Sequence, residues 1–213
     1  MATDNTNTLN SRERLLQVAE AIFLDQDYDS VSVRALTEAA GVNLALVNYH
    51  FGGKRSLYLE VLTRRFESVA TEKCARLRQA LQQQQSITLR GIVEAYVDLH
   101  LGSAERERNA RSFIRLVSRQ LDEDGDAMEL LLRKLVMPIH QLLVDEIGRL
   151  KPDLPLERIS FCLSSITGQI FHYIRCPETF HILAGFSPQA DLRERVAEHI
   201  VNFSLCGMQQ ELP

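Results

Sequence analysis

The sequence predicts an all-α fold, in which three short N-terminal helices are joined by a long helix to a larger helical domain. Apolar residues recur three and four positions apart along most of the chain, which is the period of a helix with one buried face. No segment shows the strict alternation of apolar and polar residues that is typical of a half-buried strand. We therefore expect an N-terminal domain over residues 1–53 and a larger helical domain over residues 54–213.

The first helix is predicted to begin near Ser11, capped by Asn10, and to end in the polar stretch 25–30, whose short side chains bond their own backbone. Two short helices are expected next, over 33–40 and 44–50. Between them, Gly41 can take the left-handed conformation that ends one helix, and Asn43 can cap the other.

A long helix is predicted from Lys54 to about Gln82. Pro138 should kink a later helix, because proline lacks a backbone donor. The helix after Pro155 is apolar on more than one side. We therefore predict that the last two long helices pack on the core by one face and on a second subunit by the other, although burial of both faces within one subunit remains an alternative. The helices expected after Gln82 cover residues 89–101, 113–121, 128–147, 156–175 and 188–209.

Composition narrows the class of protein. With 45% hydrophobic and 24% charged residues the chain is typical of a globular protein. No apolar run approaches the roughly 18 to 20 residues that span a bilayer, and the polar start lacks the features of a secretion signal. We expect a cytoplasmic protein with no membrane partner. The four cysteines form no CxxC pair and the six histidines show no close metal spacing. We predict no metal site, no cofactor and reduced cysteines.

The two short helices and their glycine-containing turn have the layout of a helix-turn-helix, whose second helix enters the DNA major groove. The net charge of −4 does not indicate a nucleic-acid binder, but a local group of cations can suffice.

Asparagine can donate to and accept from adenine, and small apolar side chains can contact a thymine methyl. The predicted base-reading residues are Asn43, Leu44, Ala45 and, as the strongest candidate, Asn48. The predicted phosphate contacts are Ser32, Arg34, Tyr49, His50 and Lys54. The alternatives are a helical bundle without DNA contact and, for His50 alone, a structural histidine.

Residues 11–60 resemble the TetR family of repressors. The residues that carry the resemblance are Val33-Arg34-Ala35-Leu36, Ala39-Ala40-Gly41-Val42-Asn43 and Val47-Asn48-Tyr49-His50-Phe51, followed by Lys54 and Leu57. The resemblance implies a bacterial repressor with an N-terminal DNA-binding domain, a ligand-binding domain and dimerisation through the last two long helices. It also implies a palindromic operator and release from DNA by a small molecule.

Three positions depart from the family pattern: Asp27 replaces a common glycine, Val31 a threonine and Thr37 an alanine. Asp27 can still adopt the left-handed conformation at modest cost. Without a hydroxyl at position 31, Ser32 is the remaining hydroxyl for a phosphate.

A small-molecule site usually combines an apolar cavity with a few polar anchors. The residues predicted to line such a site are Phe66, Tyr96, His100, Phe113, Arg119, Gln169, His172 and Tyr173. Arg119, Gln169 and His172 are the predicted anchors, and a plain core role for each aromatic residue remains an alternative. The second half also resembles the CecR-type subgroup, whose members are associated with transport and drug-susceptibility genes. That resemblance is carried by Phe113, Ile114, Arg115 and Arg119, Pro138-Ile139, the run from Gly168 to Tyr173, and His199-Ile200.

Two other classes are alternatives to a DNA-binding regulator: a helical enzyme acting on an apolar substrate, and a helical adaptor for other proteins. No arrangement of nucleophile, base and orienting group is recognisable, and no phosphate-binding loop is present. We therefore predict that the chain is not an enzyme. Retention of a short palindromic duplex would distinguish a regulator from both alternatives.

Overall fold

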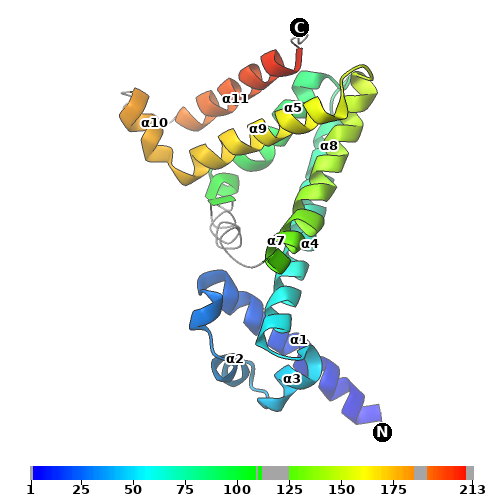
Figure 1. Ribbon diagram of the computed structural model, residues 1–213, viewed down its shortest axis with the longest axis vertical. Coiled ribbons are helices and arrows are strands. Elements are labelled where there is room, and N and C mark those ends of the chain that lie inside the picture. Colours follow the sequence, from blue (N-terminus) through cyan, green and yellow to red (C-terminus); the bar gives the residue numbers. More distant parts are fainter. Residues whose placement is uncertain (1, 109, 112–124, 185–190, 210–213) are drawn as a thin grey trace. The chain divides into compact units, whose positions relative to one another are not determined.

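The computed structural model describes residues 2–108, 110–111, 125–184 and 191–209, and every regular element in these ranges is a helix (Figure 1). The predicted all-α fold class is confirmed. The elements are α1 (Ala2–Asp25), the 3-10 turn η1 (Tyr28–Ser30), α2 (Val33–Ala40), α3 (Ala45–Phe51), α4 (Lys54–Gln82), α5 (Leu89–Leu101), α7 (Gly125–Leu131), the π-helical segment η2 (Leu132–Val136), α8 (Met137–Leu150), α9 (Leu156–Arg175), α10 (Pro177–Ala184) and α11 (Leu192–Gln209).

The start of the first helix was predicted wrongly. Helix α1 begins at Ala2, not near Ser11. Residues 2–10 contain no glycine or proline, and each of their polar residues lowers helix propensity by only a few tenths of a kcal/mol, at roughly the level of other ordinary residues. A helix held by its buried C-terminal half can therefore extend backwards through them.

Asp27 does not use the left-handed conformation that a glycine would allow at its position. Asp27 has φ −70° and ψ 146°, an extended conformation, and it precedes the 3-10 turn η1. Any residue adopts this backbone without strain. The departure from glycine at this position therefore costs the fold nothing.

The chain divides into two compact units, each built from two stretches of sequence. The first unit comprises residues 1–68 and 123–134, and in it α1 packs on α2 and α3. Its fully buried side chains include Leu15, Leu36 and Val47. This packing holds two helices of only eight and seven residues, which are too short to be stable alone.

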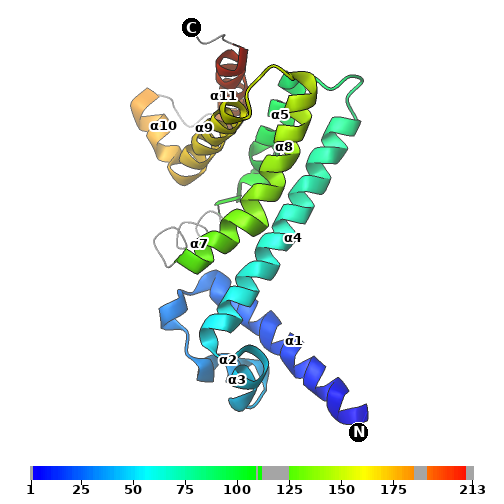
Figure 2. The same cartoon turned by 45° about the vertical axis from the view of Figure 1, so that its right-hand side comes forward.

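The second unit comprises residues 69–122 and 135–213. In it α11 lies along α5 and α9, α8 packs on α9 and α5, and α10 packs on α9 (Figure 2). Ile92, Ile147 and Ile166 are fully buried and come from α5, α8 and α9. These helices therefore share one core.

The helix predicted over 128–147 changes type along its length. The segment η2 is π-helical and runs without a break into α8, whose second residue is Pro138. Proline cannot donate to the preceding turn, and a π-helical turn is one way in which a continuous helix accommodates the missing bond. The helix predicted over 113–121 and the start expected at Ser187 and Pro188 lie outside the described residues. Within the described ranges, no helix combines the length and apolar character needed to cross a membrane.

Candidate nucleic-acid interface and effector region

Side-chain and backbone caps define the helix-turn-helix. The Ser32 hydroxyl accepts a hydrogen bond from the Ala35 backbone N–H at 3.0 Å, which starts α2. Gly41 ends α2 in the left-handed conformation at φ 61°, which a residue with a Cβ adopts only at a cost. Asn43 Oδ1 accepts from the Ala45 N–H at 2.9 Å, which starts α3. The turn thus has the geometry that its sequence predicts.

Helix α3 has one buried face and one exposed face. Val47 is fully buried and Phe51 is 8% exposed, so these two side chains anchor the helix to the first unit. By contrast, Leu44 is 55% exposed and Tyr49 is 75% exposed. Large apolar side chains left in water next to one another mark surfaces that contact a partner. The exposed set at this face is Leu44, Ala45, Asn48 and Tyr49.

The two asparagines of this surface differ in what they can offer. Asn43 is exposed, but its oxygen already caps α3. Asn48 is exposed, and within the described part of the chain its amide makes no hydrogen bond. Both its donor and its acceptor can therefore meet a base edge. This matches the paired contact that asparagine makes with adenine.

Four of the predicted phosphate contacts differ in how strongly other groups of the protein already bind them. Arg34 donates to Glu38 at 2.7 Å, but the two side chains are 84% and 65% exposed, so this pair contributes little and can open. The Tyr49 side chain points into solvent. His50 is half-buried, and among the described residues its buried Nε2 has no hydrogen-bond partner. Ser32 is exposed, with its oxygen engaged in the cap of α2.

Lys54, the remaining predicted phosphate contact, has a second role in the fold. Its ammonium donates to the Tyr28 backbone carbonyl and lies 4.0 Å from the centre of the Tyr28 ring. This links the start of α4 to the η1 turn. The Tyr28 and Tyr58 rings are 4.9 Å apart, and Tyr58 contacts Phe23 at the same separation. Lys54 therefore packs against the aromatic cluster of Phe23, Tyr28 and Tyr58. Its charge also lies at a helix N-terminus, where phosphates bind favourably.

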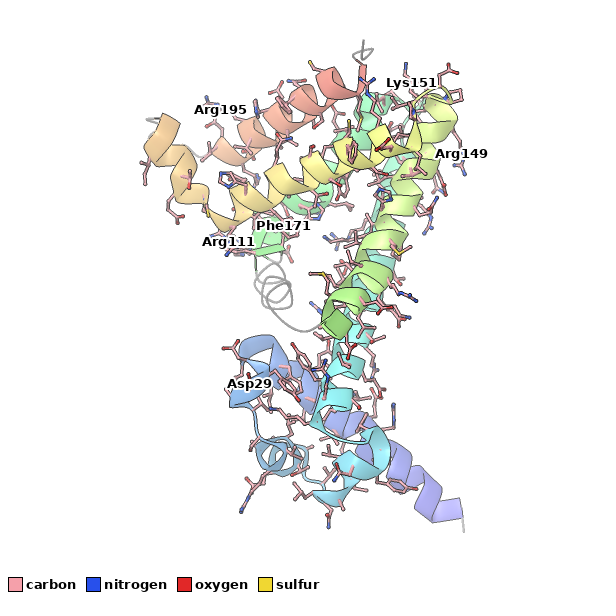
Figure 3. The ribbon with its side chains drawn as sticks, in the orientation of Figure 1. Asp29, Arg111, Arg149, Lys151, Phe171 and Arg195 are labelled. Atoms are coloured by element: carbon pink, nitrogen blue, oxygen red, sulfur yellow. The ribbon has the colours of Figure 1, made fainter. Side chains whose placement is uncertain are left out.

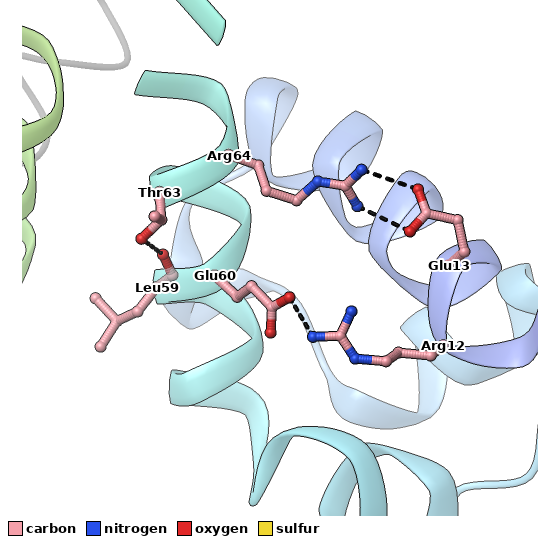
Figure 4. Close-up of polar contacts among 6 residues, drawn as sticks. All are labelled: Arg12, Glu13, Leu59, Glu60, Thr63 and Arg64. Atoms are coloured by element: carbon pink, nitrogen blue, oxygen red, sulfur yellow. Dashed lines mark hydrogen bonds and ion pairs between the residues drawn. The ribbon is translucent and has the colours of Figure 1, made fainter. Parts of the chain in front are cut away.

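Ion pairs connect α1 to α4 within the first unit (Figure 4). Arg64 donates two hydrogen bonds to Glu13, at 3.0 and 3.1 Å, and these bonds lower the pKa of the Glu13 carboxyl. Arg12 pairs with Glu60 and also lies 5.0 Å from the centre of the Phe51 ring. Helix α1 thus contacts both α4 and the last residue of α3, and fixes the direction in which α3 presents its exposed face.

The predicted effector residues do not all lie together. Tyr96 and His100 are adjacent on α5, buried, with ring centres 5.5 Å apart. Tyr173 is buried on α9, whereas His172 is exposed and Gln169 donates to the Ser165 carbonyl of its own helix at 3.4 Å. Phe66 is buried in the first unit, and the other described members belong to the second. Phe113 and Arg119 lie outside the described residues.

Two polar residues that the sequence did not single out join Tyr96 and His100. The Tyr96 hydroxyl and Thr167 Oγ1 of α9 are 2.7 Å apart, and Lys73 of α4 lies 2.7 Å from His100 Nε2. One sequence signal could have indicated Lys73. It occupies the middle of an otherwise apolar row, Val69, Lys73 and Leu77, at the helical spacing of four.

The second unit also has an open groove, which lies apart from Tyr96, His100, Thr167 and Lys73. Its volume is about 480 Å³, and its walls come from the end of α4, from α5 and from α11. The charged residues Arg90, Glu94, Asp98 and Glu198 line it. Of the predicted effector residues that the structure describes, none lines this groove. Alanine, valine and leucine side chains line it as well, so the groove combines apolar and charged walls.

Two family models match the chain. Residues 15–61 match "Bacterial regulatory proteins, tetR family", and residues 92–207 match "Tetracyclin repressor-like, C-terminal domain". The second match covers the larger part of the chain. Together they include the helix-turn-helix and most of the second unit.

Known proteins with similar sequence or structure agree with these matches. The chain is 26% identical over 171 residues to the "HTH-type transcriptional repressor AcnR" of Corynebacterium efficiens, which covers 74% of this chain and 78% of the relative. It is 32% identical over 87 residues to the "HTH-type transcriptional activator FasR" of Mycolicibacterium smegmatis, covering 41% of this chain and 39% of that protein. A crystal structure from Pseudomonas aeruginosa PAO1 shares the fold with a TM-score of 0.62, at 17% identity, over 92% of this chain and 88% of that one.

Proposed function

The chain belongs to the TetR family of bacterial regulatory proteins, and from this premise we propose that it is a repressor that binds a palindromic operator as a dimer and is released by a small molecule. The family comprises DNA-binding regulators of transcription, so the chain is not an enzyme. In this proposal residues 1–53 bind DNA, and residues 54–213 bind the effector and the second subunit. Operator binding places the protein in the cytoplasm. Assignment to the CecR-type subgroup remains a prediction.

The observation that carries this proposal is the exposed face of α3. Leu44, Ala45, Asn48 and Tyr49 project from a short helix whose opposite face is held by Val47 and Phe51. An α-helix with this arrangement fits the major groove, with its N-terminal residues at the base edges. Asn48 then reads a base. Arg34, Tyr49, His50 and Lys54 flank it and contact phosphates, together with the start of α2 at Ser32.

Repression is favoured over activation by the extent of the sequence matches. The relative named a repressor matches 74% of this chain, whereas the relative named an activator matches 41%. A bound dimer that covers a promoter excludes polymerase. The proposal therefore predicts that bound DNA lies across or next to a promoter.

The dimer is proposed to form through α9 and α11. On α9, Leu156 and Phe161 are 62% and 64% exposed, and on α11 Phe203 is 59% exposed. Small residues continue these faces, which lets two helices approach closely. They are Ser164, Ser165 and Gly168 on α9, and Gly207 on α11, all four exposed. A twofold axis through such a face would bury it against its own copy.

Release would follow from two arrangements of this dimer. In the DNA-binding arrangement the two α3 helices are about 34 to 36 Å apart, which is one turn of DNA. The effector favours an arrangement with a different separation. Its effect on DNA affinity is limited by how strongly it distinguishes the two arrangements.

Selection of duplexes from a random pool tests the DNA-binding proposal. We expect the full-length protein to enrich a short inverted repeat whose half-sites are about one helical turn apart. Enrichment without a repeat, or recovery of unchanged random DNA, would contradict the proposal. Repeating the selection with candidate metabolites and drugs tests release.

Substitution of the exposed phenylalanines tests the dimer. Phe161→Glu and Phe203→Glu should each yield monomers in sedimentation experiments at protein concentrations where the wild type is dimeric, because a carboxylate would be buried without a partner. Ile182→Glu is the matched control, since Ile182 is 78% exposed on α10, outside the proposed face. Dimers that persist in both phenylalanine variants would move the interface to another surface.

A further inference from the structure

A row of polar side chains crosses the interior of the second unit. It runs from Thr167 on α9 to Tyr96, then to His100 on α5, and ends at Lys73 on α4. The hydroxyls of Tyr96 and Thr167 are 2.7 Å apart, and Lys73 Nζ is 2.7 Å from His100 Nε2. His100 Nδ1 lies 3.3 Å from the Tyr96 backbone carbonyl. Tyr96 and His100 are both buried.

The hydrogen bonds determine the protonation state and the tautomer of His100. A lysine ammonium can only donate, so Nε2 of His100 must accept, and the proton is on Nδ1, which donates to the Tyr96 carbonyl. His100 is thus neutral. Burial, together with the neighbouring lysine, lowers the pKa of His100 to about 3. The charge of this row therefore resides on Lys73 alone.

Lys73 has no carboxylate partner among the residues that the structure describes. Glu72, the acid next to it in the sequence, pairs with Arg76 at 2.7 Å on the exposed side of α4. Burial lowers the pKa of Lys73 to about 8, so the ammonium remains largely protonated at neutral pH. Two of its three donors are without an acceptor in the described part of the chain. A partly buried charge in this state costs stability until an anion joins it.

The surroundings of Lys73 on α4 are apolar. Val69, Ala70 and Leu77, one turn before and after it, are all buried, as is Cys74. These residues already pack against the protein, so the ammonium lies in surroundings of low polarity. A small inorganic anion would lose its hydration there, whereas an organic acid offers a carboxylate to the ammonium and carries a hydrocarbon body that loses little on leaving water.

We propose that Lys73, supported by His100, binds the carboxylate of a small organic acid, and that this acid is the effector. The neutral His100 orients the ammonium, and Tyr96 and Thr167 hold His100's helix and α9 together behind it. This inference rests on the proposed function for the effect on DNA, but not for the binding itself.

The experiment measures thermal unfolding of the full-length protein with straight-chain carboxylic acids from acetate to decanoate. The matching primary amides and alcohols serve as neutral probes, and inorganic phosphate as a polar anion. We expect one or more of the acids to raise the melting temperature and the neutral probes to leave it unchanged. Calorimetry on Lys73→Gln should then show binding weakened roughly tenfold or more, because a charge-assisted hydrogen bond is lost while a donor to His100 is kept.

Two variants serve as controls. Lys151→Gln removes an exposed lysine at the end of α8 and should bind the acid like the wild type (Figure 3). Lys73→Arg keeps the positive charge and should retain most of the shift. If Lys73→Gln fails to fold, the comparison of acids with their amides on the wild type still decides the question.

The results that would overturn the proposal are distinct. Absence of any acid-dependent shift, equal shifts with acids and amides, or equal protection by phosphate would each overturn it. Acid binding without release of a selected operator would leave the site in place and remove the effector role. Acid binding by a protein that selects no operator would overturn the proposed function alone.

Discussion

The exposed face of α3 and the polar row formed by Thr167, Tyr96, His100 and Lys73 differ in what their polar side chains leave available for binding. On α3, Asn48 and Tyr49 project into solvent and stay available to a partner. In the second unit, the Tyr96 hydroxyl is hydrogen-bonded to Thr167 and His100 is hydrogen-bonded to Lys73. Within this row, among the described residues, only the Lys73 ammonium keeps donors without an acceptor. The first surface can bind a large partner without rearrangement. The second can bind only a ligand that supplies what is missing, namely a negative charge.

This difference has a consequence for mutations. Truncation of an exposed side chain on α3 should change recognition without changing stability. Truncation inside the polar row, or on the buried face of α3, should change stability first.

The largest effect is expected from two neighbours on α3 that face opposite ways. Phe51→Ala should lower the free energy of unfolding by about 3 to 5 kcal/mol, because it removes a buried ring and leaves a cavity. Tyr49→Ala should change it by no more than about 0.5 kcal/mol, because Tyr49 is 75% exposed. Chemical denaturation followed by circular dichroism measures both.

Both variants should lose affinity for the selected operator, for different reasons. Phe51→Ala loses it because α3 is no longer held, and Tyr49→Ala because a contact is gone. A large loss of stability in Tyr49→Ala would show that its ring packs against the protein, and would contradict its assignment to the DNA surface.

The next effect separates base reading from phosphate contact. Asn48→Ala should reduce discrimination between operator and random DNA by about 1 to 3 kcal/mol. Lys54→Ala should weaken binding to all duplexes alike and reduce the salt slope by about 1. Titrations at several salt concentrations measure both quantities. Equal losses for Asn48→Ala on operator and random DNA would remove Asn48 from the base-reading set.

Local spacing was enough to predict the helix-turn-helix. Gly41, the cap at Asn43 and the outward position of Asn48 all follow from residues within one or two turns of each other. The period of 3.6 residues alone decides which side of α3 faces the core. The error at Ala2 has the same origin, because helix ends depend on small differences in propensity that sequence patterns resolve poorly.

The polar row could not be predicted in this way. Lys73 and His100 are 27 positions apart, and Tyr96 and Thr167 are 71 apart. Their meeting depends on how α4, α5 and α9 pack, which no local pattern encodes. Helical spacing placed Tyr96 and His100 on one stripe of their helix, but no local pattern pairs them with Thr167 of α9 and Lys73 of α4.

A smaller effect is expected from the hydroxyl pair inside the row. Tyr96→Phe should lower the free energy of unfolding by about 1 kcal/mol, because a buried hydrogen bond is lost. Thr167 keeps one bond, since its hydroxyl also donates to the Leu163 carbonyl at 2.8 Å. Tyr49→Phe is the matched control on the exposed side and should be neutral in the same denaturation assay. Equal stability of both variants would show that the Tyr96 hydroxyl contributes nothing to the fold.

The smallest effect is expected from the exposed pair between α1 and α4. The bonds from Arg64 lower the pKa of Glu13, so the folded state favours its carboxylate. The resulting stabilisation is complete above the ordinary pKa of glutamate and is lost as pH falls through the lowered value. Both side chains are nearly half exposed, so Glu13→Gln should cost only a few tenths of a kcal/mol, roughly the range of surface pairs.

The test of this pair is the difference in unfolding free energy between wild type and Glu13→Gln, measured from neutral pH down to pH values below the ordinary glutamate pKa. The difference should be present at neutral pH, shrink in acid and shrink also in high salt, because salt screens exposed charges. Glu72→Gln, which removes another exposed pair on α4, should show the same dependence on salt. A difference for Glu13 that persists at low pH and high salt would mean that this contact depends on packing rather than charge. In that case an exposed polar group of the first unit would stabilise the fold as a buried one does.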